Sequence, residues 1–204
     1  MLNINFTPFP ELETERLFLR KLNNDDAAAV LKMRGNAETM KFIPRPLHQN
    51  INDALAHIKI INDKIDDNTG INWAINYKNT TDFIGLLGLY KIHETNFRAE
   101  IGYMILAEYN NQGIVSEAVK AVVDYGFDVM NLHSIEGVID PGNFASEKVL
   151  IKNGFVKEAH LIENEFAEGK FWDTVIYSLL KRNRLKRITK ITANSQILHD
   201  LTQL

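Results

Sequence analysis

The sequence has no cysteine and only five prolines in 204 residues. Without cysteine there can be no disulfide bond, no catalytic thiolate and no zinc site with cysteine ligands. No apolar run is long enough to cross a membrane as a helix, and residues 1–8 lack the basic-then-apolar order of a secretion signal. We therefore expect a cytoplasmic protein without a membrane partner.

Charge is distributed unevenly along the chain. The formal net charge is −3, yet residues 181–190 contain six of the 23 basic residues. Residues 1–180 hold 17 basic and 25 acidic side chains, a net charge of −8. Such an acidic body does not favour nucleic acid and suits a cationic substrate, either an amine or a basic peptide. The basic tail is typical of a solvated terminal helix, and contact with RNA or a protein partner is the alternative.

The length and the composition, 45% hydrophobic and 24% charged, indicate one globular domain at residues 1–180 with a basic C-terminal extension at 181–204. Alternating apolar residues predict strands at 12–22, 71–77, 83–92, 100–106, 134–138, 155–159 and 171–180. Helical spacing and capping residues predict helices at 27–33, 52–65, 114–130 and 147–153. This order predicts an α+β fold, with a mixed, mostly antiparallel sheet and helices on both faces.

The stretch from Glu100 to Ala118 is central to the expected fold. Its strand should run parallel to the strand that begins at Ser134, joined by a right-handed crossover through the long helix, which places it near the sheet centre. Asn110–Gly113 is a turn cluster, and helical spacing starts at Ile114. A strand, a glycine-containing loop and a helix N-terminus leave backbone N–H groups for a diphosphate, although many such loops only turn the chain.

Four segments carry a family resemblance, and together they span about residues 11–180: Leu12–Arg20, Phe83–Leu89, Ala99–Ala118 and Asn143–Phe155. In this order they resemble the Gcn5-related N-acetyltransferases (GNAT), in particular the RimJ/RimL-like branch. The resemblance implies the three-layer α/β/α arrangement of the acyl-CoA N-acyltransferases, with a splayed central sheet. It also implies that acetyl-CoA binds in the splay as co-substrate and that its acetyl group passes directly to a primary amine.

The family's diphosphate loop has the pattern Arg/Gln-x-x-Gly-x-Gly/Ala, which falls here on Asn110, Gly113 and Val115, so only the central glycine matches. Backbone N–H groups can bind phosphate oxygens whatever the side chains, so a diphosphate site is still implied. The alternative is a site with altered affinity for the cofactor. The cofactor-binding residues implied are Met104, Ile105 and Leu106 for the pantetheine arm, Asn111, Gln112, Gly113, Ile114, Val115 and Ser116 for the diphosphate, and also Asn143 and Lys152.

Two residues are implied in catalysis. Glu100 matches a glutamate of the RimL-like branch and would accept the amine proton; the alternative is an ion pair at the strand edge. Ser146 matches the serine of the Asn-x-x-Ser motif and would meet the leaving sulfur, but it would also suit the N-cap of a helix that starts at Glu147. Many family members have a tyrosine four residues later, where this chain has Leu150, so Ser146 carries more of this role.

The remaining candidates divide between site and core. The histidines lack the spacing of metal ligands, so we expect no metal site; they are His48, His57, His93, His133, His160 and His199. Four aromatic residues would line an acceptor pocket or belong to the core: Phe42, Trp73, Tyr90 and Trp172. A small amine and a protein N-terminus are both open as acceptors, and so are a monomer and a homodimer. The alternative functions are an N-terminal acetylase of a ribosomal protein and a non-catalytic acyl-CoA sensor.

Overall fold

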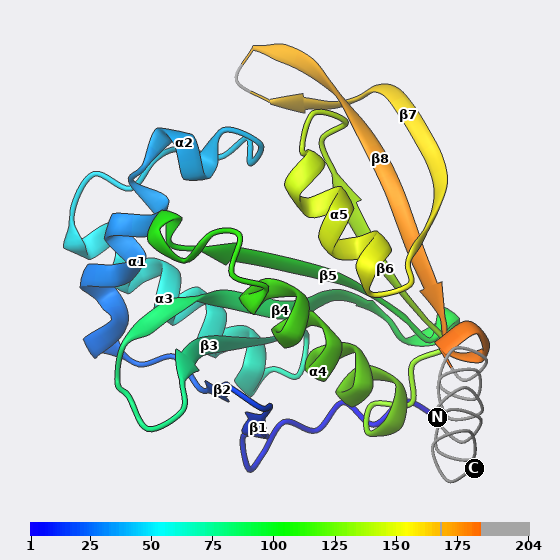
Figure 1. The fold of residues 1–204 in the computed structure, drawn as a ribbon, viewed down its shortest axis with the longest axis horizontal. Coiled ribbons are helices and arrows are strands. Elements are labelled where there is room, and N and C mark those ends of the chain that lie inside the picture. Colours follow the sequence, from blue (N-terminus) through cyan, green and yellow to red (C-terminus); the bar gives the residue numbers. More distant parts are fainter. Residues whose placement is uncertain (168, 185–204) are drawn as a thin grey trace, which may run out of the picture.

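The computed structural model describes residues 1–167 and 169–184, and its strands form one eight-stranded sheet in the order β1-β2-β3-β4-β5-β6-β8-β7 (Figure 1). The strand bounds are Leu12–Glu13 (β1), Leu17–Arg20 (β2), Ile71–Tyr77 (β3), Phe83–His93 (β4), Arg98–Ile105 (β5), Ser134–Ile139 (β6), Val156–Ala167 (β7) and Lys170–Leu180 (β8). All neighbouring strands are antiparallel except β5 and β6, which are parallel. The predicted α+β fold is therefore confirmed.

Helices cover both faces of the sheet. Figure 1 shows α4 and α5 in front of the strands and α3 behind them. The helices are α1 (Ala27–Arg34), α2 (Ala37–Met40), α3 (Ile51–Asp66), α4 (Ile114–Asp128) and α5 (Phe144–Lys152), with short 3-10 turns η1 (Asn24–Asp26), η2 (Glu94–Asn96) and η3 (Ala107–Tyr109). On the front face, α4 packs against the sheet. The ring of Tyr125 on α4 contacts Trp73 on β3 edge-on, with 5.4 Å between the ring centroids.

The N-terminal part differs from its prediction in two places. The single strand expected at residues 12–22 is a hairpin, in which Leu12 of β1 pairs with Leu19 of β2 and the N–H of Thr14 donates to the carbonyl of Leu17 at 3.0 Å. The alternation of apolar residues continues across this tight turn, so the pattern hides it. The short helix α2 was not predicted; it begins after Asn36, whose side chain accepts the N–H of Thr39.

The strands of the parallel pair β5–β6 separate along their length. The two strands pair only at Arg98–Ser134, Ala99–Ile135 and Glu100–Glu136, and beyond Glu100 they separate. Figure 1 shows them diverging from the right of the molecule toward α5 and α2. We call the opening between Ile101–Ile105 of β5 and Gly137–Ile139 of β6 the β5–β6 gap. It follows from the predicted crossover through α4, and β5 has strands on both sides as expected.

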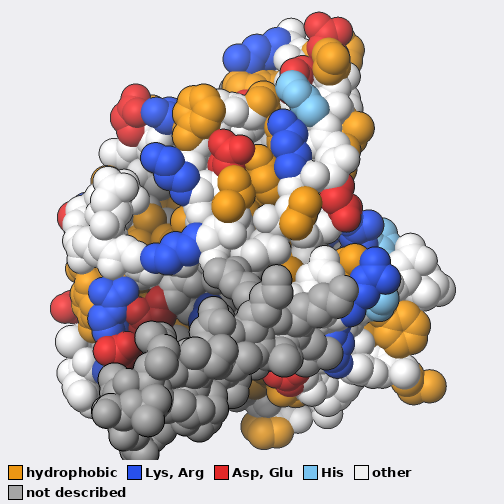
Figure 2. All heavy atoms as spheres, turned by 45° about the vertical axis from the view of Figure 1, so that its right-hand side comes forward, with side chains coloured by type: hydrophobic (Ala, Val, Ile, Leu, Met, Phe, Trp, Pro, Cys, Tyr) orange, Lys and Arg blue, Asp and Glu red, His pale blue; other side chains and the backbone are white. Residues whose placement is uncertain are grey.

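The C-terminal hairpin contains a longer strand β7 than predicted, which extends to Ala167 through two register shifts. Its outer side chains stay exposed, and Figure 2 shows hydrophobic groups over this part of the surface; they include Ile162, Phe166 and Phe171. Residues 181–184 form a helical turn, where the guanidinium of Arg184 binds the carboxylates of Asp124 and Asp128. The rest of the expected basic extension, 185–204, lies outside the described residues. No helix among the described residues is long and apolar enough to span a membrane.

Candidate active site

One edge of β5 has no partner strand along the β5–β6 gap. The N–H of Leu106 donates to the carbonyl of Ile84 on β4 at 2.9 Å, so Leu106 faces β4. Because successive residues of a strand direct their backbone groups to opposite edges, Tyr103 and Ile105 face the gap. Beyond Glu100 no described strand pairs with this edge. The gap is therefore lined by backbone donors and acceptors that an extended amide-containing chain would satisfy.

This geometry changes the expected set of pantetheine contacts. Of the three residues Met104, Ile105 and Leu106, only Ile105 directs its N–H and C=O into the gap, because the N–H of Leu106 is used by β4. The sequence reasoning missed Tyr103, although the same alternation, once the partner of Leu106 is known, points to it. Ile105 stays a prediction as a cofactor contact, and Tyr103 joins it.

The helix N-terminus next to the gap is left without a side-chain cap. Helix α4 begins at Ile114 after Gly113, which has φ 76° and makes no side-chain capping bond. Asn111 is also left-handed, with φ 60°. The first-turn N–H groups of Ile114, Val115 and Ser116 have no acceptor within the helix, and the helix dipole adds positive potential there. The loop therefore leaves backbone N–H donors of the kind that bind a phosphate group, so the diphosphate site stays a prediction; the side chain of Ile114 itself is buried.

Residues from the N-terminal hairpin hold this loop in place. The carboxylate of Glu117, in the first turn of α4, accepts hydrogen bonds from the hydroxyl of Thr14 (2.5 Å) and from the N–H and Nε of Arg16 (2.9 and 2.7 Å). Arg16 also donates to the carbonyl of Gln112 at 3.2 Å. Burial alone would raise the pKa of Glu117, but these hydrogen bonds lower it. Two of the segments that carry the family resemblance thus meet at the expected diphosphate loop.

Helix α5 places Asn143 and Ser146 beside the gap. The N-cap of α5 is Asn143, whose Oδ1 accepts the N–H of Ser146 at 3.1 Å. The helix starts at Phe144, three residues earlier than predicted, so the expectation that Ser146 caps it is wrong. The Ser146 hydroxyl forms no hydrogen bond with the described residues, whereas its carbonyl accepts from the hydroxyl of Tyr103 at 3.2 Å. A phenol and a free hydroxyl therefore lie together at the wall of the gap.

Glu100 approaches the gap from the opposite face of β5. Side chains alternate along a strand, so Glu100 faces away from Tyr103 and α5. Its side chain is 8% exposed and one carboxylate oxygen lies 2.8 Å from Nζ of Lys91. The buried hydroxyl of Tyr90 also hydrogen-bonds it, and burial together with Glu100 raises the pKa of Tyr90. The ion pair that was the alternative for Glu100 thus exists, and it holds the carboxylate in one place.

The remaining residues singled out from the sequence lie partly near the β5–β6 gap and partly elsewhere in the fold. Lys152 is exposed in the last turn of α5. Leu150, at the position of the family's tyrosine, is fully buried. Among the aromatic candidates, Trp73 is core and Trp172 lies on the β7–β8 hairpin, under Nζ of Lys170. The side chain of Phe42 comes within 3.4 Å of the point where a Cβ of Gly142 would lie, so the α2–α3 loop reaches the turn before α5.

Comparison with known proteins identifies the family. A model of the acetyltransferase (GNAT) domain matches residues 16–156. The chain belongs to the GNAT acetyltransferases. It is 35% identical over 173 residues to the uncharacterized N-acetyltransferase YoaA of Bacillus subtilis, which covers 85% of this chain and 98% of that protein. The resemblance read from the sequence, including its RimJ/RimL-like branch, is therefore confirmed, and the chain is an N-acetyltransferase.

Solved structures place this GNAT chain among acetyltransferases with different acceptors. A Vibrio cholerae spermidine N-acetyltransferase in complex with CoA and spermine superposes with a TM-score of 0.73 at 25% identity, covering 84% of this chain and 99% of that one. The ribosomal-protein-S5-alanine acetyltransferase of Vibrio fischeri gives a TM-score of 0.74 at 24% identity, covering 84% and 97%. The second likeness shows the fold alone. GNAT relatives thus bind CoA, whereas their acceptors differ.

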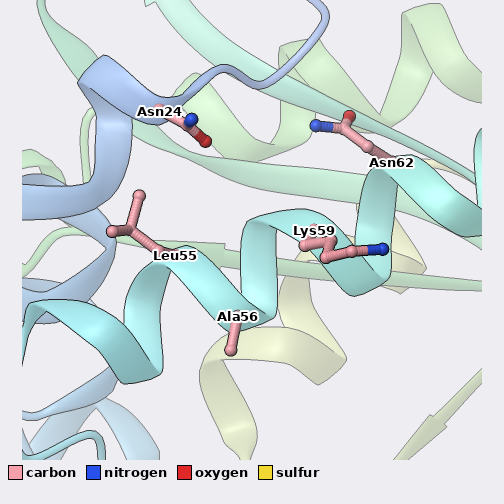
Figure 3. A pocket seen from close by; sticks show the side chains of 5 residues that line it. All are labelled: Asn24, Leu55, Ala56, Lys59 and Asn62. Atoms are coloured by element: carbon pink, nitrogen blue, oxygen red, sulfur yellow. The ribbon is translucent and has the colours of Figure 1, made fainter.

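Two hollows of this GNAT protein lie away from the β5–β6 gap. One, of about 420 Å³, lies between η1 and the outer side of α3 (Figure 3), lined by Asn24, Leu55, Ala56, Lys59 and Asn62. Its one charged group, Lys59, pairs with Asp63. The other, of about 290 Å³, contains Arg98, which binds Glu136 at 2.9 Å and the hydroxyl of Ser178 at 3.0 Å. Within residues 1–167 and 169–184, no three His, Asp or Glu side chains are grouped to hold a metal ion.

Proposed function

We propose that this protein transfers the acetyl group of acetyl-CoA directly to a primary amine. One observation carries the proposal: the unpaired edge of β5 is followed, after η3 and a short loop, by the uncapped N-terminus of α4. An extended pantetheine arm needs amide partners along its length, and a diphosphate needs several N–H donors at its end. The gap and the loop offer these two sets of partners next to each other.

Each proposed cofactor contact uses a group described above. Tyr103 and Ile105 would bind the pantetheine amides through their backbones, with Asn143 beside them on α5. The N–H groups from Asn111 to Ser116 would bind the diphosphate. Lys152 would contribute its charge at the end of α5. The bound cofactor supplies the acetyl thioester, and these residues orient it in the gap.

The reaction needs two proton transfers. Glu100, held by Lys91 and Tyr90, would accept the proton of the amine directly or through one water molecule. On the opposite face, the free hydroxyl of Ser146 would donate a proton to the departing sulfur. Tyr103 is a second candidate for this proton, because its phenol lies 3.2 Å from the carbonyl of Ser146. Its burial raises its pKa, so it stays protonated at neutral pH and available as a donor.

Calorimetric titration with acetyl-CoA tests the cofactor part of the proposal. We expect saturable binding, accompanied by a rise in the melting temperature. An absence of both heat and thermal shift at millimolar acetyl-CoA would exclude the proposed cofactor. Release of CoA in the presence of a panel of amines and peptides then tests transfer. A protein that binds acetyl-CoA without consuming it with any acceptor would be an acyl-CoA sensor, the alternative from a different class.

The acceptor is proposed only as a primary amine of a small molecule or a protein N-terminus. The solved spermidine acetyltransferase favours a small amine, whereas the ribosomal-protein acetyltransferase shares only the fold and leaves the protein N-terminus open. Specific turnover of one ribosomal peptide over free amines would favour the N-terminal acetylase.

A further inference from the structure

The segment from Leu31 to Asn50 is basic, although residues 1–180 as a whole are acidic. It holds four basic residues and a single acidic one, Glu38. Two of the basic residues are paired, Lys41 with Glu38 and Lys32 with Glu108. The two arginines, Arg34 and Arg45, have no carboxylate partner among the described residues. Four arginines elsewhere each pair with a carboxylate: Arg16, Arg20, Arg98 and Arg184.

The guanidinium of Arg34 is held by His48 through Nε, whereas its two Nη groups are left to bind a ligand. Its Nε donates to Nε2 of His48 at 3.0 Å, and its carbonyl accepts the N–H of His48 at 3.2 Å. The two Nη groups donate no hydrogen bond to any described residue. A guanidinium fixed in this way leaves a planar pair of donors with the geometry of a carboxylate or phosphate ligand.

Among the described residues, no carboxylate forms an ion pair with Arg34. Burial and the charge of Arg45 lower the pKa of Arg34, and the negative charge of a bound anion would oppose both effects. The ring of His57 lies 5.5 Å from that of His48, and burial together with Arg34 lowers the pKa of His57 to about 4, so it is neutral at neutral pH. The carboxylate of Asp53 raises the pKa of His48, but burial and the charge of Arg34 outweigh it, so the pKa of His48 is lowered.

A second donor in this cluster lacks a partner. Since Nε2 of His48 accepts from Arg34, the ring proton of the neutral imidazole lies on Nδ1. Nδ1 is buried and has no hydrogen-bond partner in the described chain. An unpaired buried donor is unfavourable, so an acceptor there would stabilise the structure. Arg34 and His48 are thus two donors that both lack an acceptor.

The cluster lies at the base of the loop that borders the β5–β6 gap. His48 lies near the end of this loop, and Phe42 at its start reaches Gly142 before α5. Arg45, exposed between them, is on the same loop. The loop thus reaches the turn that leads from β6 into α5, at the edge of the β5–β6 gap.

We propose that Arg34, His48 and Arg45 form an anion subsite for the acceptor, so that the acetylated amine carries a carboxylate or phosphate group. This inference rests on the proposed function. It replaces the cationic acceptor suggested by overall charge with an acceptor that is anionic at one end, because the local charge on this loop is positive.

Paired acceptors test the subsite. Initial rates are compared for β-alanine, γ-aminobutyrate and glycyl dipeptides against their C-terminal amides, which differ only in the negative charge. In the unaltered protein we expect kcat/KM to be higher for the acids by about tenfold or more, the value of a charge-assisted hydrogen bond. Arg34→Gln should remove this preference, and Arg45→Gln, an exposed change that should not disturb folding, should reduce it. Equal rates for acids and amides, or faster amides, would overturn the subsite.

Lys41→Gln is the matched control, since it removes one positive charge from the same segment at a residue already paired with Glu38. It should keep the preference for acids. If no acceptor of the panel is acetylated, inorganic phosphate replaces them, and the NMR signals of the Arg34 and His48 side chains are followed. A saturable shift of His48 that is lost in Arg34→Gln supports the subsite, and no shift contradicts it. Because this arm needs no acetyl-CoA, it separates failure of the subsite from failure of the proposed function.

Discussion

At the residue scale, Glu100 can be tested against a close neighbour. Glu100→Gln removes the proposed base but keeps the shape of the side chain, so we expect kcat to fall by roughly 100-fold or more, the usual contribution of general-base catalysis. Binding of acetyl-CoA should be unchanged, because Glu100 faces away from Tyr103 and the loop at α4. Steady-state rates and calorimetry on the same preparation check both parts.

The control is Glu136→Gln, because Glu136 pairs directly with Glu100 across β5 and β6 but binds Arg98 instead of Lys91. It should lose little activity. If Glu100→Gln is as active as Glu136→Gln, then Glu100 has only the structural ion-pair role.

Asn76 on β3 permits a prediction about stability. It is completely buried, and neither its Nδ2 nor its Oδ1 has a hydrogen-bond partner in the described chain. Replacing an unpaired buried amide with an apolar β-branched side chain suits a strand, so Asn76→Val should raise the free energy of unfolding by about 1–2 kcal/mol. Urea denaturation measures this, with Asn72→Val, at a less buried site of the same strand, as control. A loss of stability in Asn76→Val would contradict the assignment of an unpaired amide.

At the element scale, helix and strand bounds were predicted correctly where the spacing of apolar residues follows a single period without interruption. Strand β3 was predicted at its observed bounds, and α4 was predicted to start at its observed first residue, Ile114, because β-branched alternation and an apolar helical stripe are local signals. The boundary of α5 was missed because Asn143 and Ser146 are both good caps, and only the observed bond from Ser146 N–H to Asn143 decides between them.

The start of α4 depends on Glu117, which gives a prediction for this element. Glu117→Gln weakens the hydrogen bonds from Thr14 and Arg16, so we expect the free energy of unfolding at neutral pH to fall by about 1–3 kcal/mol. Acetyl-CoA should also bind more weakly, because Arg16 no longer holds the loop carbonyl of Gln112. Glu108→Gln, at an exposed pair with Lys32, serves as the control and should change stability little.

The contribution of Glu117 to the free energy of unfolding depends on pH. The pKa of Glu117 is lower in the folded protein than its ordinary value of 4.5, so its contribution is present above that value and is lost as pH falls through the folded pKa. The stability difference between the unaltered protein and Glu117→Gln should therefore be largest at neutral pH and shrink in acid. Urea unfolding at several pH values measures it, and a difference that grows in acid would contradict the hydrogen-bonded carboxylate.

At the scale of the whole molecule, the order of elements and the family could be read from the sequence, but the assembly of the site could not. The bond between Arg16 and Glu117 joins residues 101 positions apart, and Tyr103 meets Ser146 across 43 positions. No local pattern encodes such a pair. The subsite at Arg34 was missed for a related reason. Net charge is a sum over the whole chain, whereas a ligand binds only to the few side chains that have no partner within the protein.

The β5–β6 gap predicts which backbone amides respond to the cofactor. Tyr103 and Ile105 direct their N–H groups into the gap, whereas Met104 and Leu106 direct theirs to β4, where that of Leu106 is already bonded. Without cofactor, the first pair should exchange with deuterium much faster than the second, because exchange of an unpaired amide needs no opening of the sheet. CoA should slow Tyr103 and Ile105 selectively, as its pantetheine amides bond to the open edge. Equal protection of all four amides before CoA is added would mean that the edge is closed, and the proposed path of the cofactor through the gap would have to be abandoned.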